Sequence, residues 1–121
     1  KINDLDIKDG DPGVIFKEVL SGSVVAKKSM DKSTKENKTI TAGIQYLLLE
    51  LGYLTSKDDI DGDYGNNTAA AVKKFQIDNS LSVDEEVGKN TIKVLLEKVK
   101  EDKNLSEIKR RKIRNIITRY L

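Results

Sequence analysis

Hydrophobic positions between residues 40 and 100 recur with the period of an α-helix in three successive segments. A helix brings positions i, i+4, i+7, i+8 and i+11 onto one face, and the first segment follows that spacing. Its apolar residues are Ile40, Ile44, Leu47, Leu48 and Leu51. We therefore predict helices at about residues 41–51, 67–76 and 90–100. Their shared core is expected to contain Ile44, Leu48, Leu51, Val72, Phe75, Val94 and Leu95.

The first 37 residues show a weaker pattern. Two short apolar runs, at residues 14–20 and 23–26, are separated by Ser21 and Gly22. A β-hairpin turning at this pair is our preferred prediction, and a short helix beginning near Pro12 fits nearly as well. Residues 27–38 are polar and lack apolar periodicity, so we expect a linker there. Thr39 or Thr41 would then cap the first predicted helix.

Residues 104–121 predict a fourth, basic helix. Asn104 and Glu107 have the spacing of a capping box. The segment holds six basic residues against one acidic residue, and Ile113, Ile116 and Ile117 give it an apolar face. Such a helix can bind nucleic acid, an anionic membrane or an acidic wall polymer. We expect it instead to dock on the bundle, because the first helix is apolar all round and needs a further partner, either this helix or residues 1–26.

One short pattern occurs twice, at residues 61–68 and 84–91. Asp, Gly, Asn and Thr recur at a constant offset of 23 residues, and each copy leads into a helical run. A repeated turn and helix indicates one supersecondary unit used twice, since neither copy can bury its apolar face alone. Glu85 stands where the first copy has Gly62, so we expect the second turn to be reshaped or strained.

The order and spacing of these residues resemble the peptidoglycan-binding domain, a small three-helix module attached to many bacterial wall hydrolases. The resemblance covers about residues 38–98. The residues that carry it are Ile44, Gln45, Leu48, Leu51, Gly52, Tyr53, Asp61, Gly62, Asp63, Tyr64, Gly65, Thr68, Ala71, Val72, Phe75, Gln76, Leu81, Val83, Asp84, Val87, Gly88 and Thr91. The resemblance implies an all-α three-helix bundle that binds the bacterial wall polymer and has no catalytic activity of its own. We expect an N-terminal appendage at 1–37, this domain at 38–100, and the basic helix at 101–121.

The first of the two turns supplies the candidate ligand-binding residues. They are Tyr53, Asp61, Asp63, Tyr64, Asn66 and Asn67. A tyrosine ring can stack on a sugar, while carboxylates and amides bond its hydroxyls, its N-acetyl group or a stem peptide. Packing at the edge of a small core explains the two tyrosines equally well. Gln45 and Gln76 are interpreted as surface residues or as struts that bond the backbone.

Composition argues against catalysis and metal binding. The sequence has no His and no Cys, which removes the usual general base and the usual zinc ligands. Asp59, Asp61 and Asp63 alternate as in an EF-hand, yet Tyr64 occupies the glycine position and Ala70 the bidentate glutamate position. A paired-carboxylate glycosidase is formally allowed, but the acidic residues cluster in turns with no sign of a cleft. We predict no catalytic residues, no metal and no cofactor.

The sequence therefore predicts a non-catalytic peptidoglycan-binding module that tethers a parent protein to the wall. Its partner would be the glycan strand or the stem peptide, with an attached wall hydrolase domain or a protein partner also possible. Nucleic acid and membrane are not favoured as partners. Since the sequence begins at Lys1 without methionine, we expect a processed protein or a piece of a longer one, located outside the cytoplasm at the wall. The alternative is a protein–protein interaction module on the same fold.

Overall fold

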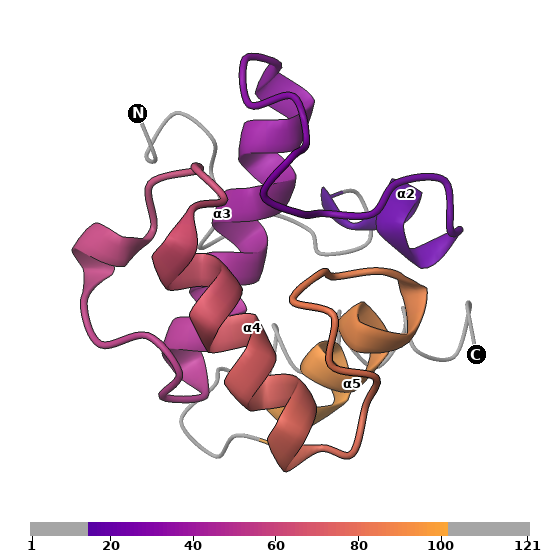
Figure 1. Ribbon diagram of the computed structural model, residues 1–121, viewed down its shortest axis with the longest axis vertical. Coiled ribbons are helices and arrows are strands. Elements are labelled where there is room, and N and C mark those ends of the chain that lie inside the picture. Colours follow the sequence, from indigo (N-terminus) through magenta and orange to yellow (C-terminus); the bar gives the residue numbers. More distant parts are fainter. Residues whose placement is uncertain (1–14, 102–121) are drawn as a thin grey trace.

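The computed structural model describes residues 15–101, which are helical with connecting loops (Figure 1). The elements are α2 (Lys17–Leu20), α3 (Lys35–Glu50), the 3-10 helix η2 (Lys57–Asp59), α4 (Asn66–Asp78) and α5 (Lys89–Lys100). Within this range there is no strand, only an isolated antiparallel bridge between Ala26 and Val87. None of these helices is long and apolar enough to cross a membrane. The basic helix predicted for residues 104–121 lies outside the described residues.

Helices α3, α4 and α5 share one hydrophobic core, which confirms the all-α prediction. Five predicted core residues have almost no exposed surface: Ile44, Leu48, Val72, Phe75 and Leu95. The other two, Leu51 and Val94, are partly buried and pack against the same core. In Figure 1, α3 and α4 descend the view in the same general direction, and the loop containing η2 returns the chain between them. The start of α4 therefore lies beside α3.

The first main helix begins at Lys35, earlier than the sequence predicted. Thr34, and neither Thr39 nor Thr41, is its N-cap, and the Thr34 hydroxyl accepts a hydrogen bond from the Asn37 N–H at 3.1 Å. The predicted linker was too long because a capped first turn needs no apolar residues. At the other end, Gly52 has a φ of 86°. It follows the last turn in the left-handed conformation that glycine adopts readily.

The preferred hairpin in the N-terminal segment is wrong. Residues 17–20 form α2, whose Val19 and Leu20 are buried together with Phe16. A Cβ built on Gly43 would lie 2.8 Å from the Phe16 ring, so this ring rests directly on the backbone of α3. A helix is favoured over a hairpin here because three apolar side chains within five residues then face one core. Residues 15 and 16 thus pack against α3, in one of the two segments expected to cover that helix.

Candidate functional site

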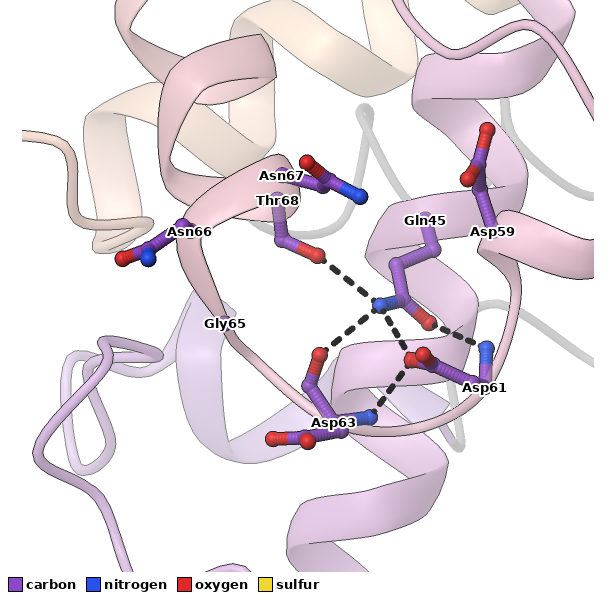
Figure 2. Close-up of a pocket in the computed structure, with 8 residues that line it drawn as sticks. All are labelled: Gln45, Asp59, Asp61, Asp63, Gly65, Asn66, Asn67 and Thr68. Atoms are coloured by element: carbon purple, nitrogen blue, oxygen red, sulfur yellow. Dashed lines mark hydrogen bonds between the residues drawn. The ribbon is translucent and has the colours of Figure 1, made fainter.

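Gln45 holds the first turn (residues 61–68) against α3 through five hydrogen bonds. Its side-chain oxygen accepts from the N–H groups of Asp61 at 3.0 Å and Gly62 at 2.9 Å. Its amide nitrogen donates to the Asp61 carboxylate at 3.0 Å, the Asp63 carbonyl at 3.1 Å and the Thr68 hydroxyl at 2.9 Å. Figure 2 shows Gln45 reaching from α3 into the centre of this turn. Because Gln45 is 1% exposed, the amide is a buried strut that fixes the turn.

Gln76 on α4 repeats this arrangement in the second turn (residues 84–91). Its oxygen accepts from the N–H groups of Asp84 at 3.2 Å and Glu85 at 3.0 Å. Its nitrogen donates to the Asp84 carboxylate and the Glu86 carbonyl, both at 2.9 Å, and to the Thr91 hydroxyl at 3.3 Å. The repeat seen in the sequence is therefore a repeat of structure, and the strut interpretation of both glutamines is confirmed.

The second turn keeps the shape of the first although it lacks the glycine. Gly62 has a φ of 76° and Glu85 a φ of 62°, so Glu85 adopts the left-handed conformation that non-glycine residues avoid. A Cβ on Gly62 would lie 3.3 Å from the Lys38 carbonyl oxygen, so a side chain there would be strained by its backbone conformation and would also make a tight contact. Of the two outcomes expected for Glu85, strain is the one observed.

The first turn borders a cavity of about 250 Å³ at the start of α4. Its lining residues are Gln45, Asp59, Asp61, Asp63, Gly65, Asn66, Asn67 and Thr68. In Figure 2 the Asn67 side chain extends toward the side of Asp59, whereas the Asn66 side chain extends away from Gln45. Lys32, from the loop before α3, pairs with the Asp63 carboxylate at 3.2 Å. The lining is polar, and its charged residues are all acidic.

The prediction that Tyr64 is a stacking platform for a sugar is wrong. Its side chain is 0% exposed and its hydroxyl donates to the Glu85 carbonyl at 2.6 Å. Burial, with the nearby carboxylates of Asp84, Glu86 and Glu85 adding to it, raises the pKa of Tyr64 well above the usual value for tyrosine. The ring therefore packs in the core and ties the first turn to the second, which is the packing interpretation weighed above.

Tyr53 belongs to a different part of the surface. Its hydroxyl donates to Asp78 at 2.8 Å, and its ring meets Phe75 edge to face with centroids 5.5 Å apart. Asp78 ends α4 and Asn66 begins it, so about 18 Å of helix separates Tyr53 from the cavity. The prediction that Tyr53 lies near the first turn is wrong. Tyr53 follows the C-terminal end of α3 and bonds the last residue of α4, whereas the first turn leads into the start of α4.

Four lining residues were absent from the predicted set, namely Gln45, Asp59, Gly65 and Thr68. The repeat already marked Gly65 and Thr68, since Gly88 and Thr91 stand at equivalent places, and Gln45 was among the residues that carry the resemblance. Within residues 15–101 no group of three acidic side chains converges to hold a metal ion. The carboxylates instead bond the chain itself: Asp61 accepts from the Asp63 N–H at 2.9 Å. What the lining offers a ligand is polar hydrogen bonding without an aromatic face.

Comparison with known proteins identifies the segment that contains this cavity. Residues 41–95 match the family model of a putative peptidoglycan binding domain. No match was found among curated proteins or solved structures. The matched segment includes α4, both turns, and α3 from Thr41 onward, so every residue that lines the cavity lies within it.

Proposed function

Because residues 41–95 match the family model of a putative peptidoglycan binding domain, we propose that this chain binds bacterial cell-wall peptidoglycan without cleaving it. It would thereby hold a parent protein or complex at the wall. The observation that carries the proposal is the polar cavity at the start of α4, lined wholly by residues of the matched segment. A binding site needs such a concave surface with a few fixed polar groups.

The lining suits a hydrogen-bonded ligand of modest affinity. Asn67 presents a carboxamide to the same cavity as the carboxylates of Asp59 and Asp61, and these groups match the hydroxyls and amides of the wall polymer. Neutral hydrogen bonds each contribute only about 0.5–1.5 kcal/mol net. A polymer with many repeats compensates for this, since several molecules or modules on one parent complex bind it at a high effective concentration.

The carboxylates of the cavity support binding rather than hydrolysis. Asp59 accepts from the N–H groups of Thr55 at 3.3 Å and Ser56 at 3.1 Å, and so caps η2. Asp61 is held by Gln45, and Asp63 is paired with Lys32. A glycosidase needs one acid free to protonate the leaving group and another free to attack or activate water. Here each of the three carboxylates already has a partner within the chain, so we propose a non-catalytic role.

Sedimentation with purified insoluble peptidoglycan of several wall types tests the proposal. A double variant, Asp63→Ala with Asn67→Ala, removes exposed polar groups of the cavity. Its matched control is Glu86→Ala with Asn90→Ala, which changes the equivalent positions of the second turn. We expect the first variant to lose sedimentation and the control to retain it, while both melt close to the parent. A parent protein that sediments with no wall type would refute the proposal.

One observation favours the alternative of a protein–protein interaction module. Ile77 is 56% exposed near the end of α4, and Val83 is 48% exposed in the loop that follows. Apolar side chains exposed this far are typical of a surface that a partner covers, although scattered single residues are also normal. Ile77→Ser with Val83→Ser leaves wall sedimentation intact if the cavity binds the wall. Loss of sedimentation in this variant would instead place the contact at the far end of α4.

A further inference from the structure

One aromatic ring with accessible surface lies away from the cavity, just after the C-terminal end of α3. Phe16, Tyr64 and Phe75 are 2% exposed or less. In the part of the chain that the structure describes, this leaves Tyr46 and Tyr53 as the half-buried aromatic side chains. Tyr53 lies beside the last residue of α4, a carboxylate to which its hydroxyl donates. It is therefore the ring that combines accessible surface with a polar neighbour.

Both the backbone and the ring of Tyr53 are held in place. The backbone belongs to the C-terminal cap of α3: Gly52 has a φ of 86°, and the Tyr53 N–H donates to the Leu48 carbonyl at 2.8 Å. The ring meets Phe75 edge to face, and the hydroxyl donates to Asp78 at 2.8 Å. A side chain fixed in this way loses little conformational freedom when a ligand packs on it.

Two polar side chains border the hydroxyl end of this ring. Asp78 is exposed and accepts from Tyr53 through its Oδ2 atom, so its Oδ1 atom can accept from a ligand. Burial raises the pKa of Tyr53, the Asp78 carboxylate adds to this rise, and a hydrogen bond with Asn79 opposes it. The Asn79 carboxamide therefore also lies close to the hydroxyl.

A fixed aromatic ring with a carboxylate and an amide at its edge suits a sugar. The C–H groups on one face of a pyranose pack against an aromatic ring and bury apolar surface. The hydroxyls at the rim of the sugar donate to a carboxylate, and its N-acetyl group both donates to and accepts from such neighbours. The glycan strand of peptidoglycan consists of sugars with these groups, so it matches the surroundings of Tyr53 better than an apolar ligand does.

We propose that Tyr53 is a stacking platform for a sugar ring of the glycan strand, with Asp78 and Asn79 bonding the rim of that sugar. The inference rests on the proposed function and adds a second contact, about 18 Å of helix away from the cavity. The cavity lining has no aromatic side chain, so the two contacts differ in kind. Ile77 is not part of this platform, because it lies two residues after Phe75 and so faces another side of α4.

The experiment compares Tyr53→Leu with Tyr46→Leu in sedimentation with insoluble peptidoglycan. Leucine keeps an apolar side chain against the core and removes the aromatic face, and Tyr46 is the matched half-buried tyrosine on α3. We expect Tyr53→Leu to bind about two- to tenfold more weakly, the loss of one aromatic contact, and Tyr46→Leu to bind like the parent. A folded Tyr53→Leu that binds like the parent overturns the inference and leaves the proposed function standing. A parent protein that sediments with no wall type overturns the proposed function itself.

A second variant and a second measurement protect the test against a folding defect. Tyr53→Phe loses the bond to Asp78 but keeps the ring, so it should bind more tightly than Tyr53→Leu, and equal losses in the two variants contradict stacking. With soluble glycan strands stripped of peptide, NMR should show upfield shifts of sugar ring protons for the parent and Tyr53→Phe, a signature that a merely structural tyrosine does not give. Competition by free stem peptides alone, weakened by added salt, would assign the ring to a cationic side chain and overturn the inference.

Discussion

Gln76 offers the sharpest test of how a turn is fixed in this fold. The residue is 0% exposed and makes five hydrogen bonds to the second turn. Gln76→Met removes all five while keeping an unbranched side chain of similar length and helix propensity. The change therefore measures what the amide hydrogen bonds contribute to stability, with little change in side-chain packing.

The expected loss follows from the partners. Five bonds at about 1 kcal/mol each set an upper figure of roughly 5 kcal/mol. Asp84 and Glu85 are exposed residues, so water can replace some of the bonds to their N–H groups. The Asp84 carboxylate also keeps its bond from the Glu86 N–H at 3.0 Å. We expect Gln76→Met to lower the free energy of unfolding by about 2–4 kcal/mol, out of a total of about 5–15 kcal/mol for a typical domain.

Urea unfolding followed by circular dichroism measures this loss. Lys73→Met on the exposed side of α4 is the control for the added thioether and should change the free energy of unfolding by less than about 0.5 kcal/mol. Gln45→Met should cost about as much as Gln76→Met, because it loses the same five kinds of bond. A loss below about 1 kcal/mol for Gln76→Met would show that the turn is held by its own residues and that the strut argument is wrong.

Two further predictions concern the junction of the two turns. Glu85→Gly should raise the free energy of unfolding by roughly 0.5–1 kcal/mol in the same urea assay, because about 1–2 kcal/mol of left-handed strain is relieved and part is offset by the freer unfolded chain; a decrease would show that the Glu85 side chain matters more than its backbone. The raised pKa of Tyr64 means that the fold favours the neutral phenol, so the contribution of Tyr64 to stability should be constant below about pH 10, the pKa of unfolded tyrosine, and fall above it. Unfolding measured between pH 9 and about 11.5 should show a smaller fall in Tyr64→Phe, and an unchanged fall would contradict the assignment.

The three main helices and the repeat were visible in the sequence because they depend on local rules. The spacing of apolar residues predicted α3, α4 and α5. The two turns were predicted by Asp, Gly and Thr, which recur at a constant offset. The helix starts were less visible: Thr34 caps α3 without any apolar signal nearby. Residues 17–20 were ambiguous between hairpin and helix, since an apolar run of this length fits both.

The candidate site was likewise predicted only in part from the sequence. The sequence indicated that the first turn carries polar side chains at a helix start, and Asp61, Asp63, Asn66 and Asn67 do line the cavity. It left open whether Tyr64 faced solvent or core, because a tyrosine suits either environment. The burial of that ring depends on the second turn, 21 residues later, supplying the Glu85 carbonyl.

What the sequence by itself determined is the identity of the units: three amphipathic helices and one turn used twice. What only the tertiary structure decided is which of the two turns is left uncovered at the start of its helix. Residues 25 and 26 pack against the start of α5, whereas a Cβ at Gly65 would meet no atom within 4 Å apart from its own chain neighbours. The physical reason is that a local pattern specifies a turn's shape, while its exposure depends on segments far away in the chain that happen to cover it.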